Sequence, residues 1–331
     1  MTVLFNKINN KELKDQLLTE DGERTTLSFY KYFTIDDPWS FRNSLYLGLS
    51  RLKILGRIYI ANEGINAQVS VPSHLYESML DVLSDMHCQL SNMRINISLD
   101  NNRQSFWVLR LKVRHRIVAD GITDSSFDAS DVGIYLTADE VNFFHDNPEV
   151  IFIDMRNDYE YEVGHFDNTL ITPGSTFRQK LPIVVEMLKK DKEKKIVLYC
   201  TGGIRCEKAS AWMRHNGFKN IYHIDGGIIQ YVRVSRMLGL PIYFKGKNFV
   251  FDQRMYESVS SEIISYCHVC GKTCDSHINC RNNTCHKLFI QCQDCSVRFN
   301  SCCSLSCMKK SLLISKEKDA SNRFKKIMSV E

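Results

Sequence analysis

Two short apolar stretches constrain the fold of this chain more than any other feature. VIFIDM (150–155) and KKIVLYC (194–200) are each the length of a strand and show no alternation of polar and apolar side chains. Strands of this kind are buried on both faces, as in a parallel sheet covered by helices. Helical patterns follow them at 177–190 and 206–217. Residues 134–240 therefore predict an α/β domain built on a parallel sheet.

Local signals agree with these helices. TADE at Thr137–Glu140 has the form of a capping box, in which the first and fourth side chains bind the free N–H groups of a helix start. Gly217 stands where a glycine commonly ends a helix. These signals predict a helix beginning near Thr137 and another ending before Gly217.

The first third of the chain has a different order of elements. Apolar periodicity predicts strand, helix, hairpin, helix and strand, and this order fits a ferredoxin-like split βαβ unit. The expected elements are a strand at 27–35, a helix at 38–53, a hairpin over 56–72, a helix at 74–87 and a long closing strand at 106–118.

Composition places the chain among globular proteins. Hydrophobic residues make up 44% and charged residues 24% of its 331 residues, with a formal net charge of +5. No apolar run approaches the roughly 20 residues that span a bilayer. The N-terminus is polar too early for a secretory signal. We therefore expect a cytoplasmic protein without membrane contact, whose mildly basic charge permits a nucleic-acid partner without requiring one.

The segment YCTGGIRC, residues 199–206, carries the strongest chemical signal. A buried strand delivers Cys200 to the carboxyl edge of the parallel sheet, where open α/β sheets bind their ligands. Gly202 and Gly203 are expected to wrap the backbone around the sulfur with positive φ angles. Inward N–H groups, the start of a helix and the charge of Arg205 all favour a thiolate, so the pKa of Cys200 should be lowered.

Other interpretations of this loop compete with a catalytic one. A cysteine at the end of a strand can be a small buried apolar residue, and a Gly-Gly pair can be only a turn. A tyrosine phosphatase loop needs five residues between its Cys and Arg, whereas four separate Cys200 from Arg205. The cradle is therefore tighter than a phosphate requires and suits a persulfide sulfur or a planar group.

Residues 150–230 resemble a rhodanese domain. The stretch IDMRNDYEYEVGHF (153–166) is similar to the entry motif of that family. After the Gly-His pair the family usually continues with Pro-Gly-Ala, and this chain has Phe166-Asp167-Asn168-Thr169 instead. The motif positions are Asp154, Arg156, Glu160, Gly164 and His165.

The resemblance extends from about residue 25 to about residue 295. GRIYIANEGINAQVSVP, YCTGGIRCEKASAWM, DGGI and GKNFVFDQRM together resemble the bacterial tRNA uridine 5-hydroxylase family. That resemblance implies an acylphosphatase-like N-terminal domain, a central rhodanese domain and a Cys-rich C-terminal region. It also implies oxygen-dependent conversion of the wobble uridine to 5-hydroxyuridine, with molecular oxygen as co-substrate, the tRNA anticodon region as partner and Cys200 as the active residue.

The loop alone leaves the reaction open. A thiolate can carry a persulfide, as in a thiosulfate or persulfide sulfurtransferase, or can add to C6 of uracil and activate C5 toward oxygen. Cys206 lies one helical turn further on and can resolve an oxidised Cys200 as a disulfide, or can simply be a packed small residue. A non-catalytic RNA-binding or scaffold protein is a third interpretation, and the presence of Cys200 argues against it.

The strand at 106–118 predicts an RNA-binding surface. Its basic residues recur at every second position and its apolar residues take the opposite phase, so the cations share one face. Cations on an open sheet face can bind phosphates, although a solvated strand face looks the same in a sequence. The neighbouring aromatics Phe29, Tyr30 and Tyr32 are equally compatible with base stacking or with the core. The basic residues are Arg110, Lys112, Arg114 and Arg116.

Ten of the 13 cysteines lie between Cys267 and Cys307. In a cytosolic protein, dense Cys-x-x-Cys spacing favours zinc over disulfides. Two such pairs can form one tetrahedral site, and a second site from Cys280, Cys285 and two later cysteines is possible. Redox activity or free thiols are the alternatives. The predicted first site consists of Cys267, Cys270, Cys292 and Cys295.

The sequence divides most simply into six parts. It carries no glycine fingerprint or Walker loop for a nucleotide cofactor, and it predicts no protein partner. The expected parts are an N-terminal extension (1–24), an acylphosphatase- or ferredoxin-like domain (25–120), a linker (121–133), a rhodanese domain (134–240), a Cys-rich region (241–308) and a basic tail (309–331).

Overall fold

The computed structural model describes residues 4, 6, 9–20, 22–100 and 105–313. The chain forms two compact units, one of Met1–Tyr161 with His165–Ser260 and one of Glu162–Gly164 with Ser261–Glu331. Of the predicted basic tail (309–331), residues 309–313 are helical and residues 314–331 lie outside the described part. Every helix among the described residues is too short or too polar to cross a membrane.

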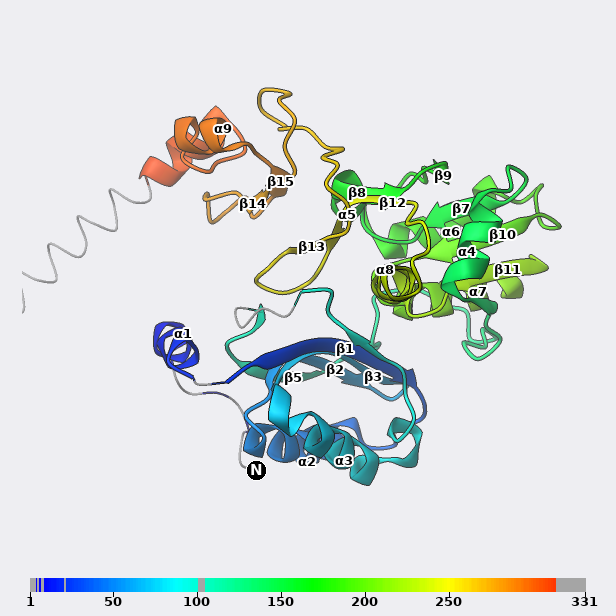
Figure 1. Ribbon diagram of the computed structural model, residues 1–331, viewed down its shortest axis with the longest axis horizontal. Coiled ribbons are helices and arrows are strands. Elements are labelled where there is room, and N and C mark those ends of the chain that lie inside the picture. The colour runs from blue at the N-terminus through cyan, green and yellow to red at the C-terminus, as the bar shows by residue number, and fades with distance from the viewer. Residues whose placement is uncertain (1–3, 5, 7–8, 21, 101–104, 314–331) are drawn as a thin grey trace, which may run out of the picture. The chain divides into compact units, whose positions relative to one another are not determined.

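The N-terminal part of the first unit is a five-stranded sheet with two helices on one side (Figure 1). The strand order is β4-β1-β3-β2-β5. In chain order the elements are α1 (Asn10–Leu18), β1 (Arg24–Tyr32), α2 (Pro38–Arg51), β2 (Leu55–Ala61), β3 (Gly64–Pro72), the short 3-10 turn η1 (Ser73–Leu75), α3 (Tyr76–Met86), η2 (Cys88–Leu90), β4 (Ile95–Ile97) and β5 (Leu109–Val113).

Apolar side chains on one face of each helix hold α2 and α3 against the sheet. Leu45 and Leu49 of α2 and Met79 and Leu83 of α3 are fully or almost fully buried in one core with the sheet. The helix α2 begins where expected, because the carboxylate of Asp37 accepts hydrogen bonds from the first free N–H groups of the helix. Both helices thus lie on one face of the sheet, and the opposite face faces away from α2 and α3.

The prediction of one long closing strand is wrong in length and position. The strand that completes the split βαβ order beside β1 is β4, Ile95–Ile97, which is too short to show a periodic pattern. The basic strand β5 covers only Leu109–Val113 and pairs in parallel with β2 at the other edge. Its alternation is as expected, since Leu109 and Leu111 are buried while Arg110 and Lys112 are exposed.

The central part of the first unit contains the predicted parallel sheet. Its strand order is β6-β11-β10-β7-β9, and every neighbouring pair is parallel. The elements are β6 (Ile134–Leu136), α4 (Ala138–His145), β7 (Ile151–Asp154), α5 (Asp158–Val163), β8 (Gly164–Phe166), β9 (Thr169–Leu170), α6 (Phe177–Met187), β10 (Lys195–Tyr199), α7 (Ile204–His215), β11 (Asn220–Ile224) and α8 (Gly227–Leu238).

Two apolar cores confirm that this sheet is covered on both faces. One core joins it to α6 and α7, and the other joins it to α4 and α8. The capping box is present, with the Thr137 N–H donating to the Glu140 carboxylate over 2.9 Å. Gly217 follows α7 with a φ of 85°, which is the left-handed conformation expected there.

After α8 the chain adds a small antiparallel sheet and then enters the second unit. The strands β12 (Phe244–Phe249) and β13 (Tyr256–Ser258) form a sheet in the order β13-β12-β8. The second unit contains the hairpin β14 (His277–Asn279) and β15 (Leu288–Ile290), followed by α9 (Gln293–Arg298). This unit holds the Cys-rich stretch.

Candidate active site

The Cys200 loop joins the central strand β10 to the start of α7. Cys200 comes directly after β10, and α7 begins at Ile204. The side chain of Cys200 has no exposed surface. The apolar strand therefore places the sulfur at the carboxyl edge of the sheet, beneath the loop and next to the N-terminus of a helix.

The two loop glycines serve different purposes. Gly203 has a φ of 99°, which L side chains rarely adopt, as predicted for a turn around the sulfur. The prediction of a positive φ at Gly202 is wrong. A Cβ at Gly202 would lie 3.3 Å from Nδ2 of Asn96, which is a tight contact, and 3.7 Å from Oγ of Ser28, which is an ordinary one.

The surroundings of Cys200 favour the thiolate. The Gly203 N–H donates to Sγ of Cys200 over 3.2 Å. Burial alone would raise the pKa of Cys200. The hydrogen bond from the Cys206 thiol, the charge of Arg205 and the N–H groups of Cys206 and Gly203 outweigh burial and lower the pKa to about 6. Cys200 is therefore largely ionised at neutral pH.

Cys206 is the proton-bearing partner in this pair. Its side chain is fully buried on α7. Burial raises its pKa well above the usual value, and the hydrogen bond to Cys200 raises it further. The interaction between the two sulfurs therefore favours one thiolate, on Cys200, and one thiol, on Cys206.

Arg205 is held by Glu160, whose role the sequence did not reveal. The two guanidinium nitrogens Nη1 and Nη2 of Arg205 donate to the two carboxylate oxygens of Glu160 over 2.6 and 2.9 Å. Nη2 also donates to Oγ1 of Thr201 over 3.1 Å. Both side chains of the pair are almost fully buried. The pair fixes the charge beside the loop, and the only sequence signal for it was the place of Glu160 in the entry motif.

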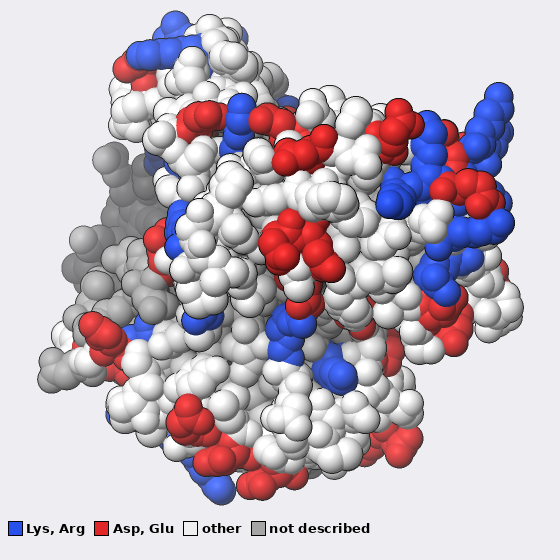
Figure 2. Space-filling model, turned by 45° about the vertical axis from the view of Figure 1, so that its right-hand side comes forward, with Lys and Arg blue, Asp and Glu red and all other residues white. Residues whose placement is uncertain are grey.

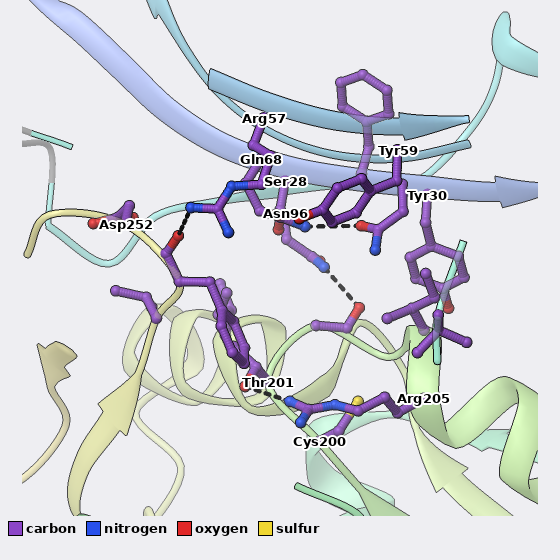
Figure 3. Close-up of a pocket in the computed structure, with 18 of the residues that line it drawn as sticks. Ser28, Tyr30, Arg57, Tyr59, Gln68, Asn96, Cys200, Thr201, Arg205 and Asp252 are labelled. Atoms are coloured by element: carbon purple, nitrogen blue, oxygen red, sulfur yellow. Dashed lines mark hydrogen bonds between the residues drawn. The ribbon is translucent and has the colours of Figure 1, made fainter. Parts of the chain in front are cut away.

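A cavity of about 700 Å³ lies between the Cys200 loop and the face of the first sheet that faces away from α2 and α3 (Figure 3). Its volume is in the usual range for small-molecule sites. Cys200 is one of the residues that line the cavity, although the residue as a whole is buried. The cavity is lined by Ser28, Tyr30, Arg57, Tyr59, Asn66 and Gln68 from the sheet, and by Cys200, Thr201, Gly202, Ile204 and Arg205 from the loop.

Hydrogen bonds from the first sheet hold the loop in place. Asn96 donates from Nδ2 to the Gly202 carbonyl over 3.0 Å. The hydroxyl of Tyr30 donates to Glu207 over 2.7 Å, and that of Tyr32 donates to the Ile204 carbonyl over 3.3 Å. These two tyrosines therefore join the sheet to α7, whereas Phe29 is a core residue.

A buried ion-pair cluster also connects the two parts. Nζ of Lys208, on α7, lies 2.6 Å from the carboxylate of Glu63 and 2.8 Å from that of Asp120. The side chains of Lys208 and Asp120 are 1% and 2% exposed. Sequence reasoning missed this cluster, because its three members are far apart along the chain.

The four cations of the basic strand do not share one environment. Arg110 and Lys112 are exposed on β5, and Arg114 lies over the ring of Tyr59 at 5.7 Å. Arg116 is paired with Glu63 over 3.0 Å. On the face drawn in Figure 2, positive and negative groups are interspersed rather than gathered into one continuous basic region.

The second unit brings eight cysteines together in two groups of four. The sulfur atoms within each group lie within 4.8 Å of one another. The first group is the predicted one, and Cys274 and Cys302 belong to neither. The groups are Cys267, Cys270, Cys292 and Cys295, and Cys280, Cys285, Cys303 and Cys307.

Comparison with family models assigns three segments. Residues 24–117 match the UPF0176 acylphosphatase like domain, and residues 137–233 match the rhodanese-like domain. Residues 245–308 match the rhodanase C-terminal domain. A solved rhodanese-like domain from Anabaena sp. covers 34% of this chain and 78% of its own, with 19% identity and a TM-score of 0.27, a score too low to support any argument.

Curated relatives match nearly the whole chain. A protein of Erwinia tasmaniensis named tRNA uridine(34) hydroxylase is 62% identical, over 97% of this chain and 91% of its own length. Proteins of the same name from Pectobacterium carotovorum and Sodalis glossinidius are each 57% identical, over 97% and 94% of this chain and 90% and 88% of their own. The chain therefore belongs to the tRNA uridine(34) hydroxylase family.

Proposed function

We propose that this chain hydroxylates C5 of uridine 34 in tRNA, with molecular oxygen as co-substrate and Cys200 as the nucleophile. The observation that carries this proposal is the low-pKa thiol of Cys200 beneath a cavity that a second domain completes. The family name of its relatives supports the same reaction. Because tRNA is the proposed substrate, we place the protein in the cytoplasm.

In the proposed mechanism, the Cys200 thiolate adds to C6 of the uracil ring. The electron pair of the C5–C6 double bond then moves to C5, which becomes electron-rich and can bond to oxygen. Loss of the C5 proton and departure of Cys200 from C6 restore the double bond. The residues around the loop support this sequence because they stabilise the thiolate before attack and after release.

Insertion of one oxygen atom, with release of the other as water, consumes two electrons and two protons. Oxygen bonded to C5 is at first a hydroperoxide. The Cys200 thiolate released from C6 attacks its outer oxygen, which breaks the O–O bond and leaves the 5-hydroxyl group. Cys206 then displaces that oxygen from the sulfur of Cys200 as water, so we assign the two electrons to these cysteines, which become a disulfide. The balanced reaction is uridine, oxygen and two thiols giving 5-hydroxyuridine, water and one disulfide. A cellular thiol must then reduce this disulfide before the next turnover.

A persulfide or thiosulfate sulfurtransferase is the alternative use of the same loop. Thiosulfate fills only a small part of a cavity of about 700 Å³. The cavity also has a wall of polar side chains from the first sheet, which a small sulfur donor would not need. Both features favour a nucleotide as the substrate.

We propose that the anticodon region of tRNA lies across β5. Arg110 and Lys112 are exposed there and share a sheet face with Arg57 and Tyr59, which line the cavity. Cations beside the cavity can bind the phosphates that flank an inserted nucleotide. Arg116 contributes less in this proposal, because its charge is already paired.

We further propose that each group of four cysteines holds one structural zinc ion. Four sulfurs bonded to zinc at about 2.3 Å in a tetrahedron lie about 3.8 Å apart. The measured S–S distances fit this geometry, at 3.7 Å for Cys270–Cys292 and for Cys285–Cys303, and 3.6 Å for Cys303–Cys307. Closed four-cysteine sites stabilise a fold and leave no ligand position for catalysis.

The direct test of the reaction uses oxygen labelled with the heavy isotope. Purified protein is given tRNA carrying U34 under this gas, and the nucleosides are analysed by mass spectrometry. The expected product is 5-hydroxyuridine with one labelled atom, formed by the wild type and by a Cys88→Ser control but not by Cys200→Ser. Label incorporated from water instead, or full activity of Cys200→Ser, contradicts the proposal.

A further inference from the structure

We propose that the sheet wall of the cavity recognises the base, and that Gln68 reads the imide edge of uracil. This inference rests on the proposed function and names the residues that select uridine. It concerns the wall opposite Cys200, where Figure 3 shows Gln68, Ser28, Arg57 and Tyr59 reaching from the strands toward the loop.

Strand register places Gln68 at the centre of this wall. Gln68 on β3 is paired with Ser28 on β1 and with Arg57 on β2. The same row continues to Asn96 on β4 and to Arg110 on β5. Residues in register share a sheet face. One row of polar side chains thus crosses the whole sheet. It begins at Asn96, which binds the Cys200 loop, and ends at the exposed Arg110.

Two hydrogen bonds fix the orientation of the Gln68 amide. Asn66 donates from Nδ2 to the backbone carbonyl of Ile117 over 3.1 Å, so its Oδ1 must point the other way. Gln68 donates from Nε2 to that Oδ1 over 2.8 Å. A backbone carbonyl cannot become a donor, so neither amide can be inverted without losing a hydrogen bond. Within the described part of the chain, Oε1 of Gln68 accepts no hydrogen bond.

The fixed amide matches uracil and not cytosine. It offers one acceptor, Oε1, and the second N–H of Nε2 as a donor. Uracil presents a donor at N3 beside a carbonyl acceptor, so both hydrogen bonds can form. Cytosine held in the same position presents an acceptor at N3 beside an amino donor, and in that position it would require the inverted amide. The anchored pair of Asn66 and Gln68 therefore selects against cytosine.

The same contact orients the reacting bond. In a pyrimidine, the imide edge and the C5–C6 bond lie on opposite sides of the ring. A uracil whose imide edge binds Gln68 on the sheet therefore presents C5 and C6 to the opposite wall, where Cys200 lies beneath the loop. A single binding position of uracil would therefore explain both its recognition by Gln68 and its attack by Cys200.

The test measures binding, so that it does not depend on turnover. A fluorescent RNA hairpin with the anticodon-loop sequence carries uridine, cytidine or an abasic site at position 34. We expect the wild type to bind the uridine hairpin roughly tenfold or more tightly than the cytidine hairpin, the discrimination typical of a bidentate contact. Gln68→Ala should bring this ratio close to one and leave the affinity for the abasic hairpin unchanged.

Two further variants make the test specific. Asn66→Ala removes the acceptor that orients the Gln68 amide, so it should also reduce the ratio without changing abasic binding. Gln89→Ala, an exposed glutamine of the same domain, is the matched control and should keep the wild-type ratio. Gln68→Met, of similar size, replaces Gln68→Ala if the alanine variant does not fold.

Two outcomes separate this inference from the proposed function. If the wild type does not distinguish uridine from cytidine, or if Gln68→Ala keeps the preference, Gln68 does not read the base. If the wild type prefers uridine through Gln68 but forms no 5-hydroxyuridine, the recognition stands and the proposed reaction fails.

Discussion

At the scale of single residues, the lowered pKa of Cys200 predicts a pH dependence. An unperturbed cysteine side chain has a pKa of about 8.5. The rate of a single turnover should instead rise with pH through an apparent pKa near 6, because the thiolate is the reacting form. The same thiolate stabilises the fold most fully above the unfolded pKa, and this contribution is lost as the pH falls through about 6.

Removal of the charge of Arg205 should shift the pH dependence of the single-turnover rate to higher pH. Arg205→Gln is combined with Glu160→Gln, so that no buried carboxylate is left without its partner. The apparent pKa of the single-turnover rate should then rise, because one of the charges that stabilise the thiolate is gone. Arg214→Gln, on the same helix and partly exposed, is the control. A profile that does not move would show that Arg205 does not act on Cys200.

The role of Cys206 can be resolved with two substitutions. Serine at 206 can still donate a hydrogen bond to Cys200 but cannot form a disulfide, whereas alanine can do neither. If Cys206 supplies electrons, Cys206→Ser and Cys206→Ala should both lose steady-state formation of 5-hydroxyuridine, by roughly 100-fold or more. A Cys206→Ser variant with nearly full activity would instead show that only its hydrogen bond matters.

The sequence could predict the local geometry of the candidate site where neighbours in the chain determine it. Cys200, Gly203 and Arg205 lie within one strand–turn–helix segment, so their arrangement follows from local geometry. Glu160 and Lys208 were missed as partners, because their contacts join residues 45 or more positions apart. The reason predicted for Gly202 was wrong, since its φ is not positive and its nearest neighbour is Asn96 on another domain.

At the scale of elements, β5 predicts how tRNA affinity depends on salt. Arg110→Gln with Lys112→Gln removes two exposed cations and should weaken tRNA binding by roughly tenfold or more at low salt. It should also lower the slope of log affinity against log salt by about 2, since each phosphate contact contributes about one unit. Arg51→Gln, at the end of α2, should leave both quantities unchanged. Equal losses in both variants would contradict an RNA surface on β5.

Elements of ordinary length were predicted well, and short ones were not. The expected ranges agree to within two residues with the helices α2, α3 and α7 and with the strands β7 and β10. The strands β4, β6 and β9 have two or three residues each, too few to show a period. Overlooking β4 led to the wrong position for β5, because the closing place beside β1 was assigned to the only visible candidate.

At the scale of the whole molecule, the two groups of cysteines predict a metal content. Protein purified without chelator should hold two zinc ions per chain. Cys270→Ser and Cys303→Ser should each reduce this to one, and each should lower the melting temperature, because metal binding contributes to folding. Cys88→Ser, outside both groups, should retain two ions. A metal content of zero, with free thiols at all eight positions, would contradict zinc binding.

The packing of the two parts of the first unit could not be predicted from the sequence. The residues 121–133 were expected to be a linker between two domains, and that expectation says nothing of the contacts between them. Tyr30, Tyr32 and Asn96 bind the Cys200 loop and its helix. Such contacts depend on the final arrangement of two sheets, which no local pattern encodes. The cavity belongs to both, so its polar wall became visible only in the structure.

The central claim is that Cys200 acts in the hydroxylation of uridine 34. The most direct measurement is nucleoside mass spectrometry of tRNA from cells that lack this protein, complemented with the wild type or with Cys200→Ser. We predict that 5-hydroxyuridine and its derivatives are lost, return with the wild type and remain absent with Cys200→Ser. Unchanged 5-hydroxyuridine together with a loss of 2-thiolated nucleosides would contradict this account and identify the loop as a sulfur carrier.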